Sequence, residues 1–255
     1  MNEKNNHVYL DVNGEWRPCN PKMAGSGVVA CRPQVGTCPG NCLDCFFKGG
    51  RYYENINEPH IPNPDWVNEN GLVVRMNDGN DSNYERDLVI KTASKYNDVF
   101  FNTRIPKLDF PGPVVLTVNG DYTDDAAWLV NPHQMEMLMA VRVRVNTWNT
   151  ALVTEVINYY SQYNIPVRLT FMAYYFGTVK EPEHYIWKKR TVNPYWCISN
   201  SARKDLEHRF QVDGFDIHTC TSTKGHYCRD CGKCLEVYKK WKEVHSYFIR
   251  GESKQ

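Results

Sequence analysis

The sequence predicts an α/β protein built as an open, partial (β/α)6 barrel of parallel strands with a small cysteine-rich C-terminal extension. Three observations support this fold. Apolar runs alternate with helical segments about six times, polar side chains share one parity along the runs, and a cysteine-rich loop follows the first run. Alternating strands and helices are typical of a parallel sheet, and six units rather than eight indicate an open barrel.

Each expected strand is a short apolar run. The six runs lie at residues 27–31, 72–76, 99–104, 114–118, 141–146 and 167–174. Helices fit between them: Ser82 and Glu85 form a capping box for a helix that extends to about Tyr96, and Asn149 precedes a helix with apolar residues at helical spacing. We expect an N-terminal cover segment at residues 1–25, the barrel at 26–180 and the C-terminal extension at 181–255.

Polar side chains share one parity along five of the expected strands, so they lie on one face of the sheet. They are Arg75, Asn77, Asn102, Arg104, Thr117, Asn119, Arg142, Arg144, Asn146, Arg168 and Thr170. A barrel packed only for stability would be apolar on both faces of its sheet, which indicates a hydrated interior. Because buried arginines are costly unless they are paired with anions, we expect a carboxylate, a phosphate or an acidic substrate inside. The alternative is that some of these arginines lie at exposed strand ends.

Composition narrows the class of protein. The 255 residues suffice for one large domain or a domain with an appendage, and a hydrophobic fraction of 42% supports an ordinary core. With 30 basic and 29 acidic residues, no bulk field attracts nucleic acid, although a local basic patch would allow it. No apolar run approaches the ~20 residues of a membrane span. We therefore expect a cytoplasmic protein that does not bind a membrane.

Cys38, Cys42 and Cys45 lie on one Pro-Gly loop after the first expected strand. Their spacing lets three thiols converge on one metal centre, and an all-thiolate set favours zinc or an iron–sulfur cluster. Three ligands leave one coordination position open, which distinguishes a reactive centre from a closed structural one. A zinc knuckle or disulfide bonds are the alternative.

The Cys-x3-Cys-x2-Cys spacing resembles the signature of the radical S-adenosylmethionine (SAM) superfamily. The resemblance implies that the three cysteines hold an oxygen-sensitive 4Fe-4S cluster whose fourth iron binds SAM through its amino and carboxylate groups. It also implies an electron donor such as flavodoxin or ferredoxin, and cleavage of SAM to a 5′-deoxyadenosyl radical that takes a hydrogen atom from the substrate. The family usually has an aromatic residue just before the third cysteine. Here Asp44 stands there, and Phe46 and Phe47 follow Cys45.

The resemblance further implies SAM-binding residues at the strand ends. In that family the second strand ends in a Gly-Gly-Glu-like turn that binds the SAM amino group. Asp78-Gly79-Asn80-Asp81 occupies this place and supplies flexible backbone and acceptors, although it is not a literal match. An ordinary polar turn is the alternative. The other candidates for binding SAM are Phe46, Arg104, Asn119, Arg144 and Asn146.

Four further thiols, Cys220, Cys228, Cys231 and Cys234, lie close together near the C-terminus and precede an amphipathic helix at 235–244. Four sulfurs suit a structural zinc site, and the Cys-x2-Cys-x2-Cys run suits an auxiliary 4Fe-4S cluster. One of the histidines nearby, at positions 218 and 226, would be able to replace a thiol.

Two hypotheses about function follow. The first is a radical SAM enzyme that acts on an anionic small-molecule or nucleotide-type substrate. The second is a non-enzymatic zinc-binding protein that presents aromatic and basic residues to a nucleic acid or a protein partner. The 16 tyrosines and seven tryptophans favour the second, whereas the nearly neutral net charge and the repeated alternation of strand and helix favour the first.

Overall fold

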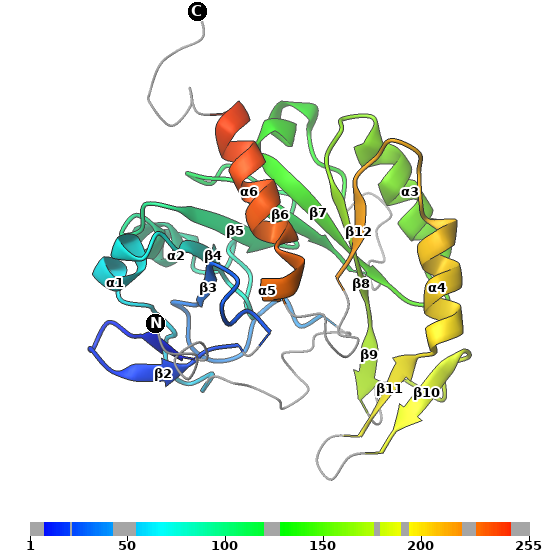
Figure 1. Ribbon diagram of the computed structural model, residues 1–255, viewed down its shortest axis with the longest axis horizontal. Coiled ribbons are helices and arrows are strands. Elements are labelled where there is room, and N and C mark those ends of the chain that lie inside the picture. Colours follow the sequence, from blue (N-terminus) through cyan, green and yellow to red (C-terminus); the bar gives the residue numbers. More distant parts are fainter. Residues whose placement is uncertain are drawn as a thin grey trace, which may run out of the picture.

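A curled sheet of seven parallel strands forms a half-barrel at the centre of the protein (Figure 1). The computed structural model describes residues 8–20, 22–42, 55–119, 128–175, 179–189, 194–220 and 228–245. Within them the strand order is β12-β8-β7-β6-β5-β4-β3, and every neighbouring pair is parallel. The predicted α/β class and the partial, barrel-like sheet are therefore confirmed.

The elements follow one another as expected for a parallel sheet with connecting helices. The strands of the main sheet are β3 (Val28–Cys31), β4 (Val73–Met76), β5 (Val99–Thr103), β6 (Val114–Val118), β7 (Leu138–Val145), β8 (Val167–Phe171) and β12 (Ile217–Thr219). The helices are α1 (Pro64–Glu69), α2 (Arg86–Ala93), the 3-10 helix η3 (Pro132–Met137), α3 (Thr150–Ser161), α4 (Asn200–Arg209), α5 (Cys228–Cys231) and α6 (Lys233–Val244).

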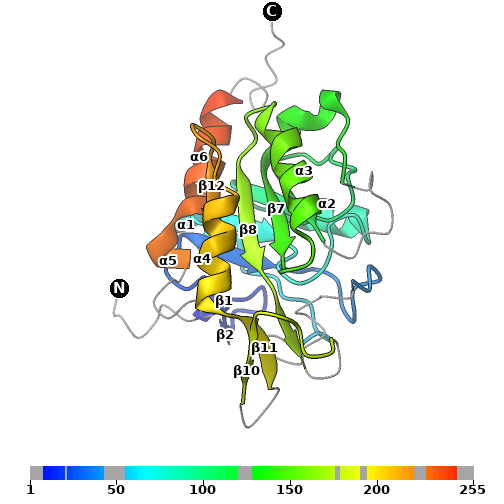
Figure 2. The same ribbon diagram turned by 90° about the vertical axis from the view of Figure 1, so that its right-hand side faces the viewer.

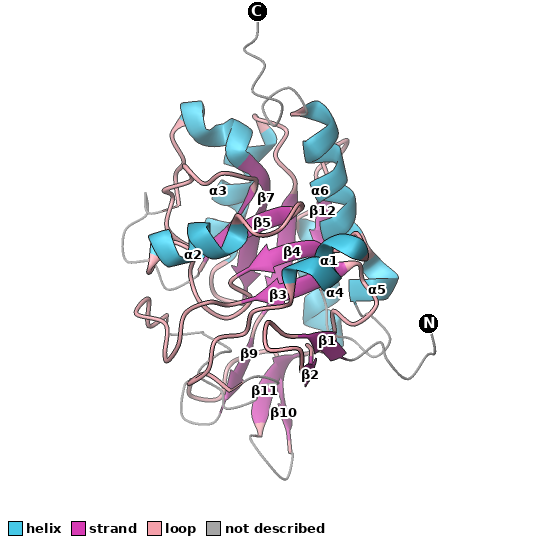
Figure 3. Ribbon diagram, turned by 90° about the vertical axis from the view of Figure 1, so that its left-hand side faces the viewer, coloured by secondary structure: helices cyan, strands magenta, loops and turns pink. Residues whose placement is uncertain are grey.

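Two small antiparallel sheets lie outside the main sheet. One is the hairpin of β1 (Val8–Leu10) and β2 (Trp16–Pro18), and the other joins β10 (Tyr185–Lys188), β11 (Tyr195–Ile198) and β9 (Ala173–Tyr175) in that order. Figure 3 shows both below β3 and β4 in that view. Because β9 follows β8 after one residue, the single strand predicted at 167–174 is divided between two sheets.

The outer face of the main sheet packs against helices. Its apolar residues form one core cluster with side chains from four helices, which include Val67 of α1, Val89 of α2, Val156 of α3 and Leu206 of α4. Burying each such side chain contributes about 1.5–3 kcal/mol. Figure 2 shows α3 and α6 on opposite sides of β7 and β8. The apolar residues of the alternating pattern therefore lie on the face of the sheet that these helices cover.

The C-terminal helix α6 covers part of the inner face, near the N-terminal ends of the strands. The residues in this contact are Val237, Tyr238 and Trp241 of α6 with Val73, Phe100, Val115 and Ala140 of the sheet. The Tyr238 hydroxyl donates to Asp98 Oδ1 at 2.8 Å, and Trp241 Nε1 donates to the Glu136 carbonyl at 2.8 Å. The predicted amphipathic helix is confirmed. The expectation of a hydrated interior is wrong at this end, because α6 fills it.

Three features of the structure differ from the predicted elements. The capping box does not form, because Ser82 Oγ accepts from Asn77 Nδ2 at 3.1 Å and Glu85 has a left-handed backbone, so that α2 begins only at Arg86. The connection from β5 to β6 is fully described and contains no helix. The sheet also includes a strand that the sequence analysis did not predict, β12, which pairs with β8.

β12 comes from the segment that we assign to the C-terminal extension, and yet it forms the edge of the main sheet. The division of the chain at residues 25 and 180 stays a prediction. No helix among the described residues is both long enough and apolar enough to cross a membrane.

Candidate functional site

The parallel strands bring the cysteine loop and several polar residues to one edge of the sheet. After β3 the chain runs through residues 32–42 and reaches side chains at the C-terminal ends of β5 and β6. α/β barrels build their active sites at this edge. Of the predicted site residues, Cys45 and Phe46 lie outside the described residues, as does Asp44.

The sulfur of Cys42 accepts hydrogen bonds from two neighbouring strand ends. Arg104 Nη1 donates to Cys42 Sγ at 3.3 Å, and Asn119 Nδ2 donates to it at 3.2 Å. Arg104 follows β5 and Asn119 follows β6. Ligand sulfurs in iron–sulfur sites accept hydrogen bonds of this kind. The structure thus brings together three residues that the sequence analysis selected.

Gly40 lets the cysteine loop approach its neighbours closely. A Cβ atom at this position would lie 3.3 Å from Tyr84 Cε2, 3.4 Å from Cys38 Sγ and 3.6 Å from Arg104 Nε. Cys38 and Cys42 are therefore both close to Arg104. Burial raises the pKa of Tyr84; Arg104 opposes this effect, while a nearby carboxylate and the two thiols add to it. Sequence reasoning missed Tyr84, which no motif marks.

Two buried polar residues hold the loop in place. Arg32 donates from its guanidinium to the carbonyls of Gln34, Asn55 and Glu58. Gln34 Nε2 donates to the Tyr84 carbonyl at 2.8 Å. Because every one of these bonds ends on a backbone carbonyl, they fix the path of the loop. The sequence analysis missed both residues; the signal that would have found them is a charged and an amide side chain directly after a buried strand.

The turn after β4 is stabilised by its own hydrogen bonds. The buried Asp81 accepts from Thr103 Oγ1 at 2.8 Å, from Asn83 N at 2.9 Å and from Arg104 N at 2.6 Å. Burial raises the pKa of Asp81, and these hydrogen bonds oppose the rise. Asp81 therefore holds the end of β5 against the turn that follows β4.

Asp78 also has partners within the protein. It forms an ion pair with Arg75 and accepts from Asn20 Nδ2 at 3.1 Å. Asn80 Oδ1 accepts from the backbone of the next residue at 2.8 Å, and Gly79 is half-buried. The four-residue turn lies at the C-terminal end of β4, where the resemblance requires it, while SAM binding by this turn stays a prediction.

Three asparagines at adjoining strand ends each have a buried amide oxygen without a hydrogen-bond donor in the described part of the chain. They are Asn77, Asn102 and Asn119, which are 2%, 6% and 1% exposed. Their amide nitrogens donate to Ser82 Oγ, to the Met76 carbonyl and to Cys42 Sγ, respectively. An unsatisfied buried acceptor costs about 1–3 kcal/mol. A ligand that donates N–H or O–H groups at this edge would remove that cost.

The end of β7 is arranged differently. Asn146 Oδ1 accepts from Trp148 N at 3.0 Å and from Asn149 N at 2.8 Å, and Asn146 Nδ2 donates to the Tyr174 hydroxyl at 3.0 Å. The carbonyl of the half-buried Arg144 accepts from Asn149 Nδ2 at 2.8 Å. These bonds position the start of α3. Contacts of Arg144 or Asn146 with SAM stay predictions.

The four C-terminal thiols come from three elements that meet on the inner face. Cys220 follows β12, Cys228 and Cys231 are the first and last residues of α5, and Cys234 lies in the first turn of α6. Burial raises the pKa of Cys220, and the thiols of Cys234 and Cys231 add to this effect. The thiols are thus close enough for one to oppose the ionisation of another.

His218 Nε2 lies 3.1 Å from Cys231 Sγ. In the described ranges, no three side chains of His, Cys, Asp or Glu converge as the ligands of a single metal ion. No disulfide bond joins any two of the nine described cysteines. Metal binding at either cluster stays a prediction, and His226 lies outside the described residues.

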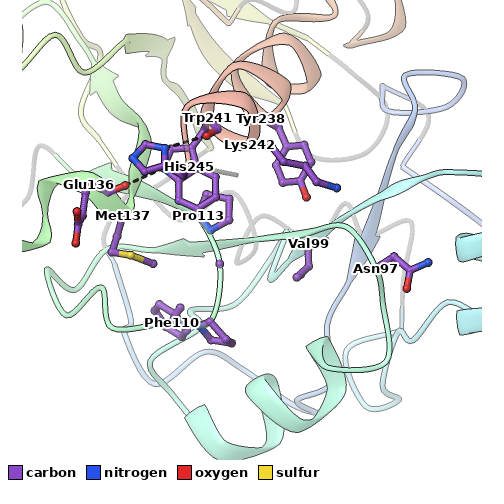
Figure 4. A pocket seen from close by; sticks show the side chains of 12 residues that line it. Asn97, Val99, Phe110, Pro113, Glu136, Met137, Tyr238, Trp241, Lys242 and His245 are labelled. Carbon is purple, nitrogen blue, oxygen red and sulfur yellow. Dashed lines mark hydrogen bonds between the residues drawn. The ribbon is translucent and has the colours of Figure 1, made fainter. Parts of the chain in front are cut away.

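A pocket of about 430 Å³ lies near the N-terminal ends of β5 and β6, away from the cysteine loop (Figure 4). On the sheet side the pocket is lined by Phe110, Pro113 and Met137. On the side of α6 it is lined by Trp241 and His245, and the centroids of their stacked rings lie 4.5 Å apart. This end of a barrel usually serves stability. Since no thiol lines the pocket, we do not assign the candidate active site to it.

Comparison of the chain with protein-family models, curated proteins and solved structures finds no match. The candidate function therefore rests on the chain's own residues and on the contacts described above.

Proposed function

We propose that this protein is a radical SAM enzyme in which Cys38, Cys42 and Cys45 hold a 4Fe-4S cluster with one iron open to SAM. The observation that carries the proposal is the pair of N–H donors, Arg104 and Asn119, aimed at Cys42 Sγ at the C-terminal edge of a parallel sheet. Hydrogen bonds to ligand sulfurs are one of the means by which proteins set the potential of such clusters.

The asparagine oxygens at the same edge fit the second part of the proposal. SAM carries an amino group, two ribose hydroxyls and an exocyclic adenine amine, all of which donate hydrogen bonds. Asn77, Asn102 and Asn119 offer buried acceptors on three adjoining strands. Acceptors in this number would be costly without such a ligand. They support SAM as the ligand better than they support a closed structural zinc site.

The chain's own residues would have separate tasks. Arg104 and Asn119 donate hydrogen bonds to the sulfur of Cys42, while Arg32 and Gln34 hold the loop over the strand ends. When bound, the cluster supplies the electron that cleaves SAM to methionine and a 5′-deoxyadenosyl radical, which takes a hydrogen atom from the substrate. An electron donor such as flavodoxin or ferredoxin is part of the proposal.

An anionic small molecule or a nucleotide is the substrate class that we propose, because the inner face carries several arginines. Two of these already have carboxylate partners: Arg75 pairs with Asp78, and Arg168 with Asp216. The partial (β/α)6 barrel belongs to the same proposal. The parallel half-barrel with outer helices supports it, and the number of units remains a prediction.

Anaerobic reconstitution tests the proposal. The full chain is loaded with iron and sulfide, reduced with dithionite and mixed with SAM, and 5′-deoxyadenosine is measured by chromatography. We expect brown protein that forms this product. Cys42→Ser should abolish product formation, because the cluster loses a ligand that no other described residue replaces.

Cys197→Ser is the matched control, since Cys197 is also a half-buried cysteine but lies on β11. It should retain product formation. Colourless protein that keeps only zinc after reconstitution would contradict the proposal and favour the non-enzymatic zinc-binding protein.

A further inference from the structure

The inner face has a row of polar residues that crosses four strands at the level of the C-terminal thiols. In the register of the sheet, Thr117 lies beside Arg142, Arg142 beside Arg168, and Arg168 beside His218. These positions share the parity of the residues that contact α6. The row therefore lies inside the half-barrel, next to the segment that carries the thiols.

The thiols reach this row from both edges of the open sheet. At the β12 edge, Cys220 has the same parity as His218, and its N–H donates to the Leu169 carbonyl at 2.7 Å. At the β3 edge, the N–H of Cys228 donates to the Lys22 carbonyl, which precedes β3, at 2.8 Å. His218 Nε2 lies 3.1 Å from Cys231 Sγ and so joins the two sides.

Arg142 differs from the other arginines of this region. Arg168 donates to both carboxylate oxygens of Asp216, at 2.9 and 2.8 Å, and Arg75 pairs with Asp78. Arg142 has no carboxylate partner in the part of the chain that the structure describes. In the register of the sheet Arg142 lies beside Arg168, which lies beside His218, and Cys220 follows His218 on the same face.

A half-buried cation on the interior strand β7 is stabilised by a negative partner. Four thiolates carry more negative charge than a zinc ion or the core of a 4Fe-4S cluster neutralises, so a centre built from them remains anionic. We propose that the C-terminal thiols hold a metal centre inside the half-barrel, and that Arg142 is the counter-charge of this centre rather than a substrate-binding residue. Since metal binding and local folding are coupled in thiolate sites, the ligand set would close when the metal binds.

This inference is independent of SAM chemistry, and its test does not use catalytic activity. The full chain with Cys38, Cys42 and Cys45 changed to serine keeps the C-terminal thiols as its only cluster of cysteines, because Cys19, Cys31 and Cys197 stand apart in the sequence. It is loaded either with zinc or with iron and sulfide, and the metal that remains is measured during competition with a chelator. In the form that the site accepts, Arg142→Met should lower the apparent metal affinity by about 10-fold or more, as loss of an outer-shell partner typically does.

Arg144→Met is the matched control, because Arg144 lies on the same strand and the same face, two residues nearer the strand end. Arg144→Met should change the apparent metal affinity by less than about twofold. Arg142→Lys keeps the positive charge, so its metal affinity should be close to that of the chain with Arg142. This variant keeps the test valid if Arg142→Met folds poorly. Equal losses for Arg142→Met and Arg144→Met would overturn the proposal, as would a chain that retains neither metal.

Amide hydrogen exchange tests the interior location separately. Loading with metal should slow exchange at Cys220 and Cys228, whose N–H groups bind the carbonyls of Leu169 and Lys22. Unchanged exchange at both amides in metal-loaded protein would contradict a centre that joins the two edges of the sheet.

Discussion

The two thiol clusters of this protein depend on the fold in different ways. Cys38 and Cys42 come from one short loop, and the fold adds donors from the ends of β5 and β6. The C-terminal thiols come from β12, α5 and α6 and meet only because the last part of the chain folds back into the half-barrel. The first cluster should therefore be sensitive to the support of its loop, and the second to the packing of α6.

Removal of a large side chain from α6 gives the largest expected effect. Trp241→Ala removes an indole that is 9% exposed and its bond to the Glu136 carbonyl, so it should lower the free energy of unfolding by about 3–5 kcal/mol. Urea unfolding measures this loss. Because the C-terminal thiols depend on the packing of α6, the variant should also lose metal at these thiols at a lower urea concentration than iron at the Cys38 loop.

The exposed residue at the end of the same helix serves as the control. Val244 is 64% exposed, and Val244→Ala should change stability by less than about 0.5 kcal/mol. Equal stability of Trp241→Ala and Val244→Ala would show that the packing of α6 does not depend on Trp241. Simultaneous loss of both metals in Trp241→Ala would show that the two thiol clusters do not differ in their dependence on α6.

Acid should weaken the support of the Cys38 loop. Burial, with Arg32 nearby, lowers the pKa of His60 from 6.5 to about 3, and the backbone of His60 exchanges hydrogen bonds with that of Arg32 at 2.7 and 2.8 Å. Below pH 6.5 the imidazole of His60 binds a proton in the unfolded chain but stays neutral in the folded protein. The stability from His60 is therefore complete above pH 6.5 and is lost as the pH falls toward 3.

This loss should be on the order of 3 kcal/mol at about pH 4 relative to neutral pH, at 1.36 kcal/mol per pH unit. Urea unfolding across this range measures it, with His60→Gln as the reference that carries no titrating ring. Wild-type protein and His60→Gln with the same pH dependence would show that the buried histidine does not determine the acid sensitivity of this region.

Most of the main sheet was predictable because its strands are apolar runs buried on one face under helices. β12 was missed because Ile217, His218 and Thr219 form a run that is too short and too polar to stand out. The start of α2 was misjudged for a physical reason: the left-handed backbone of Glu85 interrupts the helical turn that a capping box at Ser82 requires.

The candidate site was predictable only in part. Parity along the strands selected Arg104 and Asn119, but their contact with Cys42 depends on the curl of the sheet and on the path of the loop. Arg32 and Gln34 bind backbone carbonyls that lie more than twenty residues away in the sequence. A pattern of side chains does not reveal partners of this kind.

Electron paramagnetic resonance of the anaerobically reduced full chain, recorded with and without SAM, shows whether the Cys38 loop holds a cluster that binds SAM. If the Cys38 loop holds a 4Fe-4S cluster with an open iron, addition of SAM should change the spectrum of the wild-type protein and leave that of Cys42→Ser unchanged. A wild-type spectrum that contains no iron–sulfur signal, or one that SAM does not alter, would contradict the account.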